Sequence, residues 1–213
     1  MEEASGMTFS VAQRTRILSL KSSIASYYNL QMKKIGDAVL QNYFYNDCVI
    51  TGGCISSLFH NEAVNDIDVY AKTKKSMMTI KDHIIQSGNS IKTANAYNLD
   101  DSDISRPLIT ENAVTLTNDV QFIYLGTVDE CRPKFDFMHC MPWFDIQSQR
   151  LHISESQYTA IESKTLVLNI SGEAVKDRRI QKYLSKGWTL KEAPVPGIVI
   201  QEVKSLMRGV GVL

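Results

Sequence analysis

The chain has 213 residues, enough for one compact domain with an adequate core, or for one domain and a smaller appendage. Hydrophobic residues make up 44% of the chain and charged residues 22%, which are ordinary values for a soluble globular protein. The formal net charge is zero, which excludes a molecule that attracts nucleic acid through its overall charge.

The predicted elements begin with helices. Ser10-x-x-Gln13 resembles a capping box and predicts a helix start, and a second helix is expected over about residues 29–43. Short strands are expected at 47–51 and 66–71, with a helix from Gly53 to about Phe59 between them. A further helix is expected over 75–86, ended by Gly88.

The second half of the chain opens with a polar stretch, residues 88–112, which predicts a long loop or insertion. Ser154 is expected to start a helix that lasts to about Glu162. Strands are expected at 113–117, 120–125, 134–139, 149–153 and 166–170, and helices at 172–186 and 198–207.

These elements predict an α+β fold: a small mixed β-sheet core flanked by helices, with a mainly helical C-terminal part. We expect three regions. They are N-terminal helices at 1–46, the core at 47–153 and the C-terminal part at 154–213.

The cysteines form no Cys-x-x-Cys pair and have no matching histidine spacing, which argues against a zinc site. The sequence shows no signal-peptide pattern and no apolar run near 18 residues. We therefore expect reduced thiols in a cytoplasmic protein that does not contact membranes. The cysteines are Cys48, Cys54, Cys131 and Cys140.

Two acids form the central motif, Asp66-Ile67-Asp68. Side chains at i and i+2 of a strand project from one face, so both carboxylates can bind the same pair of cations. Asp136, between Phe135 and Phe137, is the candidate for a third ligand, because an acid among aromatic residues is costly to bury unless paired or metal-bound. Asp145 is the competitor for that role, although a turn near Pro142 indicates a loop position.

A glycine pair, Gly52-Gly53, ends the apolar run at 48–51 and precedes the predicted helix. Glycines at such a junction let backbone N–H groups and a helix N-terminus approach phosphate oxygens. The motif therefore predicts a triphosphate site at the turn and two divalent cations at the acids, Mg²⁺ with Mn²⁺ as the alternative.

The glycine pair, the short helix, Asp66-x-Asp68 and the later Asp136 together resemble the nucleotidyltransferase superfamily that includes DNA polymerase beta and the CCA-adding enzymes. The resemblance covers roughly residues 47–140. It implies that Asp66 and Asp68 lie on one strand and Asp136 on its neighbour. It also implies a nucleoside triphosphate such as ATP at the glycine turn.

Downstream, Phe135-Asp136-Phe137 with His139-Cys140, Ser163-Lys164-Thr165-Leu166 and Arg179-x-x-Lys182-Tyr183 with Gly187-Trp188 resemble predicted nucleotidyltransferases of large tailed bacteriophages. This resemblance extends over most of the chain. It implies action in a host cytoplasm if the chain is phage-encoded.

Two departures separate the chain from close superfamily members. CCA-adding enzymes carry Arg-Asp where this chain has Ser56-Ser57, which argues against a true CCA-adding enzyme. Antitoxin-like and antibiotic-modifying members carry Gly-Ser at the turn, and Ser56 or Ser57 is the candidate to replace that hydroxyl.

Basic residues gather after residue 163, where nine Lys or Arg stand against four acids. Arg179 and Lys182 are the candidates for phosphate contact, and a solvated helix face is the alternative. His139 is expected on the opposite sheet face from Asp136, as a hydrogen-bonded structural residue or, less simply, a substrate contact.

These residues predict a Mg²⁺-dependent nucleotidyltransferase that moves a nucleoside monophosphate to an acceptor hydroxyl and releases pyrophosphate. An RNA end is the expected acceptor, with a protein or small molecule as alternatives. A non-catalytic nucleotide or nucleic-acid binding module is the alternative from another class.

Overall fold

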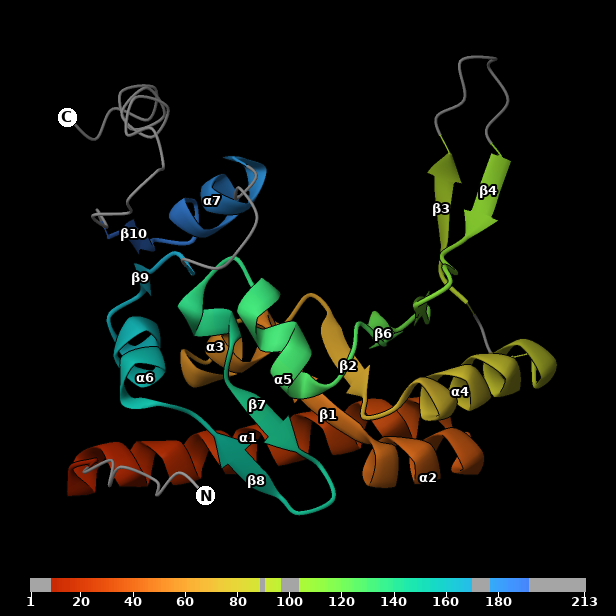
Figure 1. Cartoon of the computed structure of the whole chain (residues 1–213), viewed down its shortest axis with the longest axis horizontal. Helices are drawn as coiled ribbons and strands as arrows, with labels where there is room; N and C mark the ends of the chain where they lie inside the picture. Colours follow the sequence, from red (N-terminus) through yellow and green to blue (C-terminus); the bar gives the residue numbers. More distant parts are fainter. Residues whose placement is uncertain (1–8, 89–90, 97–103, 170–176, 192–213) are drawn as a thin grey trace.

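The computed structural model describes residues 9–88, 91–96, 104–169 and 177–191. Its centre is a six-stranded mixed sheet in the order β5-β6-β2-β1-β7-β8 (Figure 1). The middle strand β2 pairs antiparallel with β1 and parallel with β6. The strands of this sheet are β1 (Cys48–Thr51), β2 (Ile67–Ala71), β5 (Ala113–Thr115), β6 (Val120–Ile123), β7 (Trp143–Asp145) and β8 (Arg150–His152). The predicted mixed sheet flanked by helices is confirmed.

Helices and two short strand pairs surround the sheet. Over the described residues the helices are α1 (Val11–Ile35), α2 (Ala38–Asp47), α3 (Gly53–Phe59), α4 (Lys74–Gln86), α5 (Val128–Cys131), α6 (Glu155–Glu162) and α7 (Asp177–Leu184). Two 3₁₀ turns are η1 (Arg132–Lys134) and η2 (Met138–Cys140). An antiparallel pair joins β3 (Thr93–Ala96) to β4 (Ile104–Pro107), and a parallel pair joins β9 (Thr165–Leu166) to β10 (Thr189–Leu190). In Figure 1, β3 and β4 project at the opposite end of the molecule from α7.

The first helix begins where the sequence predicts. The Ser10 hydroxyl accepts a hydrogen bond from the Gln13 N–H at 3.2 Å, and the Gln13 side chain accepts one from the Ser10 N–H at 2.9 Å, so the capping box is confirmed. The predicted start of a second helix near residue 29 is wrong, because α1 continues to Ile35. It ends at Gly36, whose φ of 70° is left-handed. α2 follows, capped by the Asp37 carboxylate.

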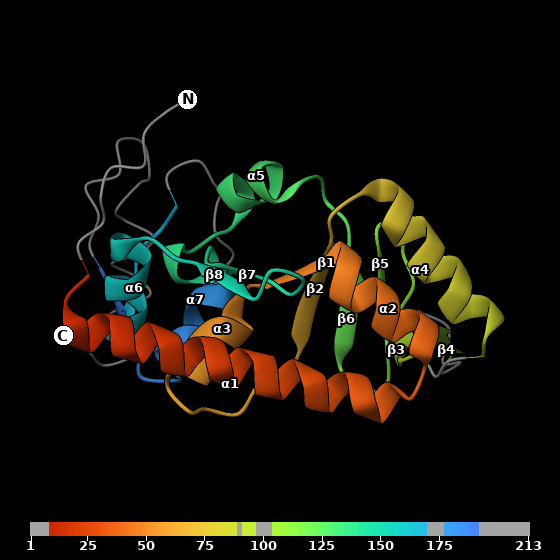
Figure 2. The same cartoon turned by 90° about the horizontal axis from the view of Figure 1, so that it is seen from below.

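One face of the sheet carries the main core. Ile50, Val69 and Phe122 are buried on this face, and side chains of α2 and α4 such as Phe44 and Ile80 pack against the same cluster. Each fully buried side chain of this size contributes about 1.5–3 kcal/mol. Figure 2 shows α1 running along the length of the molecule on this side, where it also contacts α3 and β8.

The other face carries a smaller cluster and the acids. Val49, Tyr70 and Ile123 are buried there with Cys131 of α5. Because side chains alternate along a strand, Asp68 lies on the same face as Tyr70. The sheet therefore presents its acidic motif on the face that also carries the short α5–η1 segment.

The predicted strand at 134–139 is wrong. η1 and η2 occupy its two ends, and the chain between them makes a single isolated bridge, from Phe137 to Leu168. The two aromatic residues are buried differently. Phe137 is buried with Leu166, whereas the partly buried Phe135 packs against both that cluster and the one that contains Tyr70. Asp136 therefore does not lie on a strand beside β2, whose neighbours are β1 and β6.

The polar stretch predicted as a loop at 88–112 contains β3 and β4, so that prediction is wrong for the paired residues. The expected strand at 166–170 is reduced to Thr165–Leu166, and the helix expected at 172–186 is described from Asp177 as α7. The helix expected at 198–207 lies outside the described residues. None of the described helices combines the length and apolar character needed to cross a bilayer.

Candidate active site

The turn between β1 and α3 requires glycine at both positions. Gly52 has a φ of +91°, and its N–H donates to the Cys140 carbonyl at 3.1 Å. A Cβ at Gly52 would lie 3.0 Å from Asp68 Oδ2, and one at Gly53 would lie 2.8 Å from the Tyr183 hydroxyl. Backbone therefore approaches both an acid of β2 and a tyrosine of α7 more closely than any side chain would allow.

The two acids of the motif lie beside this turn. Asp68 pairs with Thr51 in the β1–β2 register, and Asp66 precedes β2 by one residue. Burial, and after it the charge of Asp66, raise the pKa of the half-buried Asp68 to about 6, against the opposing charges of Lys182 and Arg179. A cation bound between the two carboxylates would relieve this repulsion.

A cavity of about 360 Å³ joins the glycine turn to the acids. One wall is acidic, another carries Arg179 and Lys182 of α7, and the rest is mostly aromatic or apolar, with Lys134 as a third basic residue. Its lining residues are Gly52, Gly53, Cys54, Asp66, Asp68, Tyr70, Leu125, Cys131, Lys134, Phe135, Asp136, Phe137, Cys140, Arg179, Lys182 and Tyr183. Its volume falls within the usual range of small-molecule sites, and an apolar wall with a few charged groups is typical of them.

Asp136 lines the same cavity, but its carboxylate forms an ion pair with the Arg179 guanidinium. The Asp136 side chain is only 13% exposed, and its hydrogen bond raises the pKa of Arg179. Within the described part of the chain, no three His, Cys, Asp or Glu side chains are gathered closely enough to hold a metal ion. Asp66 and Asp68 are neighbours, whereas Asp136 shares their cavity and is held by arginine.

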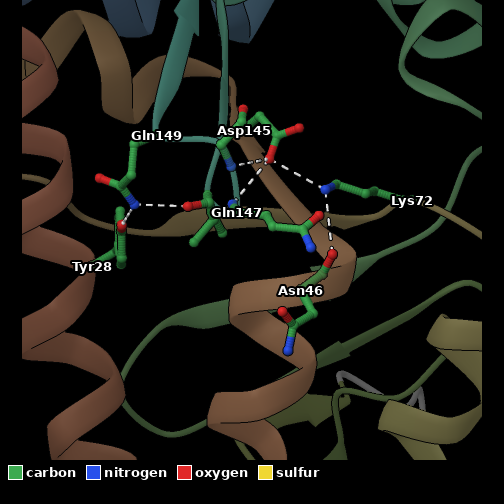
Figure 3. Close-up of polar contacts among 8 residues, drawn as sticks. Tyr28, Asn46, Lys72, Asp145, Gln147 and Gln149 are labelled. Atoms are coloured by element: carbon green, nitrogen blue, oxygen red, sulfur yellow. Dashed lines mark hydrogen bonds and ion pairs between the residues drawn. The ribbon is translucent and has the colours of Figure 1, made fainter.

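Asp145 is wrongly expected in a loop, since it ends β7. It pairs with Val49, whereas Asp68 pairs with Thr51, so the two acids lie toward opposite ends of β1. Figure 3 shows the Asp145 carboxylate accepting hydrogen bonds from the Gln147 N–H at 3.0 Å and the Lys72 ammonium at 3.2 Å. Partial burial raises the pKa of Asp145, but the hydrogen bonds and the charge of Lys72 lower it by more, so the pKa is lowered overall. This acid stabilises the β7–β8 turn and does not reach the cavity.

Comparisons with known proteins place this geometry in a family. The family model described as "Gad2: Gabija anti-defense 2 family protein" matches residues 21–164, which contain the glycine turn and all three candidate acids. The chain belongs to the Gabija anti-defense 2 family. A curated relative, Gabija anti-defense 2 of Bacillus phage SPbetaL7, is 24% identical over 168 residues, which are 78% of this chain and 40% of the relative. The chain therefore spans less than half the length of that relative.

Solved structures similar to this family member include CCA-adding enzymes. The Thermotoga maritima CCA-adding enzyme complexed with tRNA has a TM-score of 0.50 and 12% identity, over 82% of this chain and 42% of that one. A tRNA nucleotidyltransferase complexed with a primer tRNA and an incoming ATP analogue has a TM-score of 0.47 and 12% identity, over 78% and 47% of the two chains. At this identity the likeness concerns the fold alone, which is that of the nucleotidyltransferases.

The two serines after the glycine turn, Ser56 and Ser57, differ in burial. Ser56 is 2% exposed, and its hydroxyl donates to the Gly53 carbonyl at 2.9 Å, so it supports the turn from behind. Ser57 is partly exposed and lines a second, smaller cleft beside Asp66. Of the two candidate serines, Ser57 is the one that lines this cleft.

His139 lies in η2 and not on the expected strand. It is fully buried, with its ring centroid 4.4 Å from that of Tyr183 and 4.2 Å from that of Trp188. The expectation of a hydrogen-bonded structural residue is wrong in one respect, because neither ring nitrogen has a partner among the described residues. Burial lowers the pKa of His139 to about 3, so the ring is neutral at physiological pH.

Sequence reasoning missed Tyr183 as a residue of the cavity. Its hydroxyl lies against Gly53 and 3.4 Å from Cys140 Sγ, and burial raises the pKa of Tyr183. The available signal was its position one turn after Arg179 on the same predicted helix. Tyr183 thus fixes α7 against the glycine turn.

Proposed function

We propose that this protein is a metal-dependent nucleotidyltransferase. The observation that carries the proposal is the single cavity that combines the Gly52-Gly53 turn, Asp66 and Asp68, and the cations of α7. In the proposed reaction an acceptor hydroxyl oxygen forms a bond to the α-phosphorus of a nucleoside triphosphate. The bond from that phosphorus to the bridging oxygen breaks, pyrophosphate leaves with the electron pair, and the hydroxyl proton passes to solvent.

The triphosphate would lie between the glycine turn and α7. Backbone N–H groups at the start of α3 point toward anions there, and Gly52 and Gly53 leave room for their approach. Arg179 and Lys182 line the same cavity and supply positive charge. Ser56 would act by holding the turn, through its hydrogen bond to Gly53.

The carboxylates suit Mg²⁺ or Mn²⁺, which both prefer oxygen ligands. Asp66 and Asp68 fit, because their mutual repulsion in a half-buried site favours a bound cation. When bound, two such ions would neutralise the charge that develops on pyrophosphate and on the attacking oxygen. We propose Asp136 as the third ligand, which requires Arg179 to leave it and bind phosphate instead.

The Asp136–Arg179 ion pair also favours a second candidate, a nucleotide-binding protein without catalysis. If the pair persists when nucleotide binds, only two carboxylates remain for metal. Binding would then occur without divalent cation, and no pyrophosphate would be released.

The acceptor is proposed to be an RNA end, with a protein hydroxyl or a small molecule as alternatives. The family description concerns counteraction of a defence system and states no chemistry. A relative from a Bacillus phage makes the cytoplasm of an infected bacterium the proposed place of action. Under this proposal, nucleotidyl transfer to a host molecule would serve the counter-defence.

The test is release of pyrophosphate from α-labelled nucleoside triphosphates with Mg²⁺ or Mn²⁺, in the presence of bacterial RNA and protein fractions. Asp68→Asn removes a metal-binding charge at similar volume and should abolish the release while the protein stays folded. Asp145→Asn is the matched control, because the same change is made toward the other end of β1, and it should retain turnover. Equal turnover in the wild type and Asp68→Asn would reject the assignment.

A further inference from the structure

A second cleft opens beside Asp66. It encloses about 20 Å³ and shares Gly53, Asp66 and Lys182 with the large cavity. Tyr183 also lines both clefts, and the polar residues that line the small cleft alone are Ser57, Asn65 and Lys186. The two clefts therefore meet at the acidic motif. If each cleft held a ligand, the two ligands would come together beside Asp66.

The small cleft has room for one compact group and not for a nucleobase. A space of about 10–15 Å³ holds a single water molecule, so the enclosed 20 Å³ admits one or two oxygen-sized atoms, such as the outer oxygens of a phosphate whose other atoms lie in the open mouth of the cleft. Ser57 and Asn65 can donate hydrogen bonds to such a group from the α3 side.

The charge of the cleft favours an anion. Among the described residues, neither Lys182 nor Lys186 has an acidic partner within ion-pair distance, whereas Lys164 and Arg179 are each paired. Lys186 follows α7, is partly buried and lines the cleft, so its side chain is less free than that of a fully exposed lysine. Two ammonium groups without an ion-pair partner outweigh the single Asp66 carboxylate of the cleft, and with two neutral donors they suit a phosphate group.

Nucleotidyl transfer requires two reactants to meet at the acids. The larger cavity suits the triphosphate, which leaves the small cleft for the acceptor. We propose that the small cleft binds a backbone phosphate of a single-stranded RNA acceptor, with Lys186 as its principal contact, and so directs the terminal hydroxyl to Asp66. A protein acceptor would bring no phosphate for these lysines. This inference rests on the proposed function and assigns its acceptor.

The test measures binding of a short 5′-fluorescein-labelled single-stranded RNA by fluorescence anisotropy, without triphosphate, over a series of KCl concentrations. Lys186→Ala should weaken RNA binding about fourfold near physiological salt and reduce the slope of log affinity against log salt by about 0.7, as one lost phosphate contact predicts. Lys186→Arg keeps the charge and should restore both. Lys75→Ala is the charge-matched control on exposed α4 and should leave both at wild-type values.

Loss of affinity and slope in Lys186→Ala alone supports the proposal. Equal losses in Lys186→Ala and Lys75→Ala, or wild-type binding in both, would overturn it. Pyrophosphate release by the wild type separates failure of this inference from failure of the proposed function, because the release depends on the acids and not on Lys186. Transfer of label to protein with equal efficiency in wild type and Lys186→Ala would also overturn it.

Discussion

His139 offers a direct test of how burial controls the stability of the C-terminal cluster. Its ring is enclosed by Phe137, Tyr183 and Trp188, and both nitrogens lack partners among the described residues. Its pKa in the folded protein is about 3, against 6.5 for an exposed histidine. Because the unfolded chain binds the proton first as pH falls, stability should decrease below about pH 6.5 and stop decreasing near pH 3.

The magnitude follows from the separation of the two pKa values. From pH 7.5 to 5.5 the free energy of unfolding should fall by about 1 kcal/mol on account of His139, and by about 3 kcal/mol by pH 4.5. His139→Phe removes the titrating group and should remove this part of the pH dependence. Urea unfolding monitored by tryptophan fluorescence at each pH would measure it.

The slope against pH separates titration from packing. A phenylalanine that packs too tightly would lower stability equally at every pH. His152→Phe is the matched control, because His152 is only half-buried and stacks on Trp143 at one side. The burial argument fails if wild type and His139→Phe lose stability in parallel as the pH is lowered.

Two further outcomes are expected around the glycine turn and α7. Gly53→Ala should lower the free energy of unfolding by about 1–3 kcal/mol, since its Cβ would meet the Tyr183 hydroxyl, and Tyr183→Phe in the same chain should return part of the loss. Calorimetry of the single and double variants would measure the loss and its recovery. If Tyr183→Phe recovers no stability, the strain does not arise from the Tyr183 hydroxyl. Arg179→Ala should raise the apparent triphosphate requirement about tenfold, on the order of one charged hydrogen bond. Unchanged kinetics would show that Arg179 does not contact the triphosphate and would favour the alternative of a solvated helix face.

Local signals made much of the fold predictable. The capping serines Ser10 and Ser154 begin helices as expected, because a side chain that satisfies a free N–H acts within three residues of sequence. Strands β1 and β2 and the glycine turn between them were also predicted, since an apolar run that ends at Gly52 leaves few alternatives.

Long-range choices were not predictable. The alternating pattern of Phe135 and Phe137 indicates a strand. Phe137 is instead buried in one cluster while Phe135 packs against two, an arrangement that the local pattern cannot indicate. The ion pair between Asp136 and Arg179 joins residues 43 positions apart, and the sequence around neither residue indicates it. His139 likewise gave no sign that its ring would be enclosed without a hydrogen-bond partner.

The helix that brings positive charge to the acids, α7, packs through Ile180 into a separate hydrophobic cluster. Phe137, Cys140, Leu166, Ile180 and Trp188 form that cluster, distinct from the large core beneath the sheet. Cooperative units of this kind can unfold below the global free energy of unfolding. Transient release of α7 would then uncover the carboxylates and withdraw Arg179 and Lys182 in one event, so that under the proposed function the same fluctuation would admit a bulky reactant and interrupt catalysis until α7 returns.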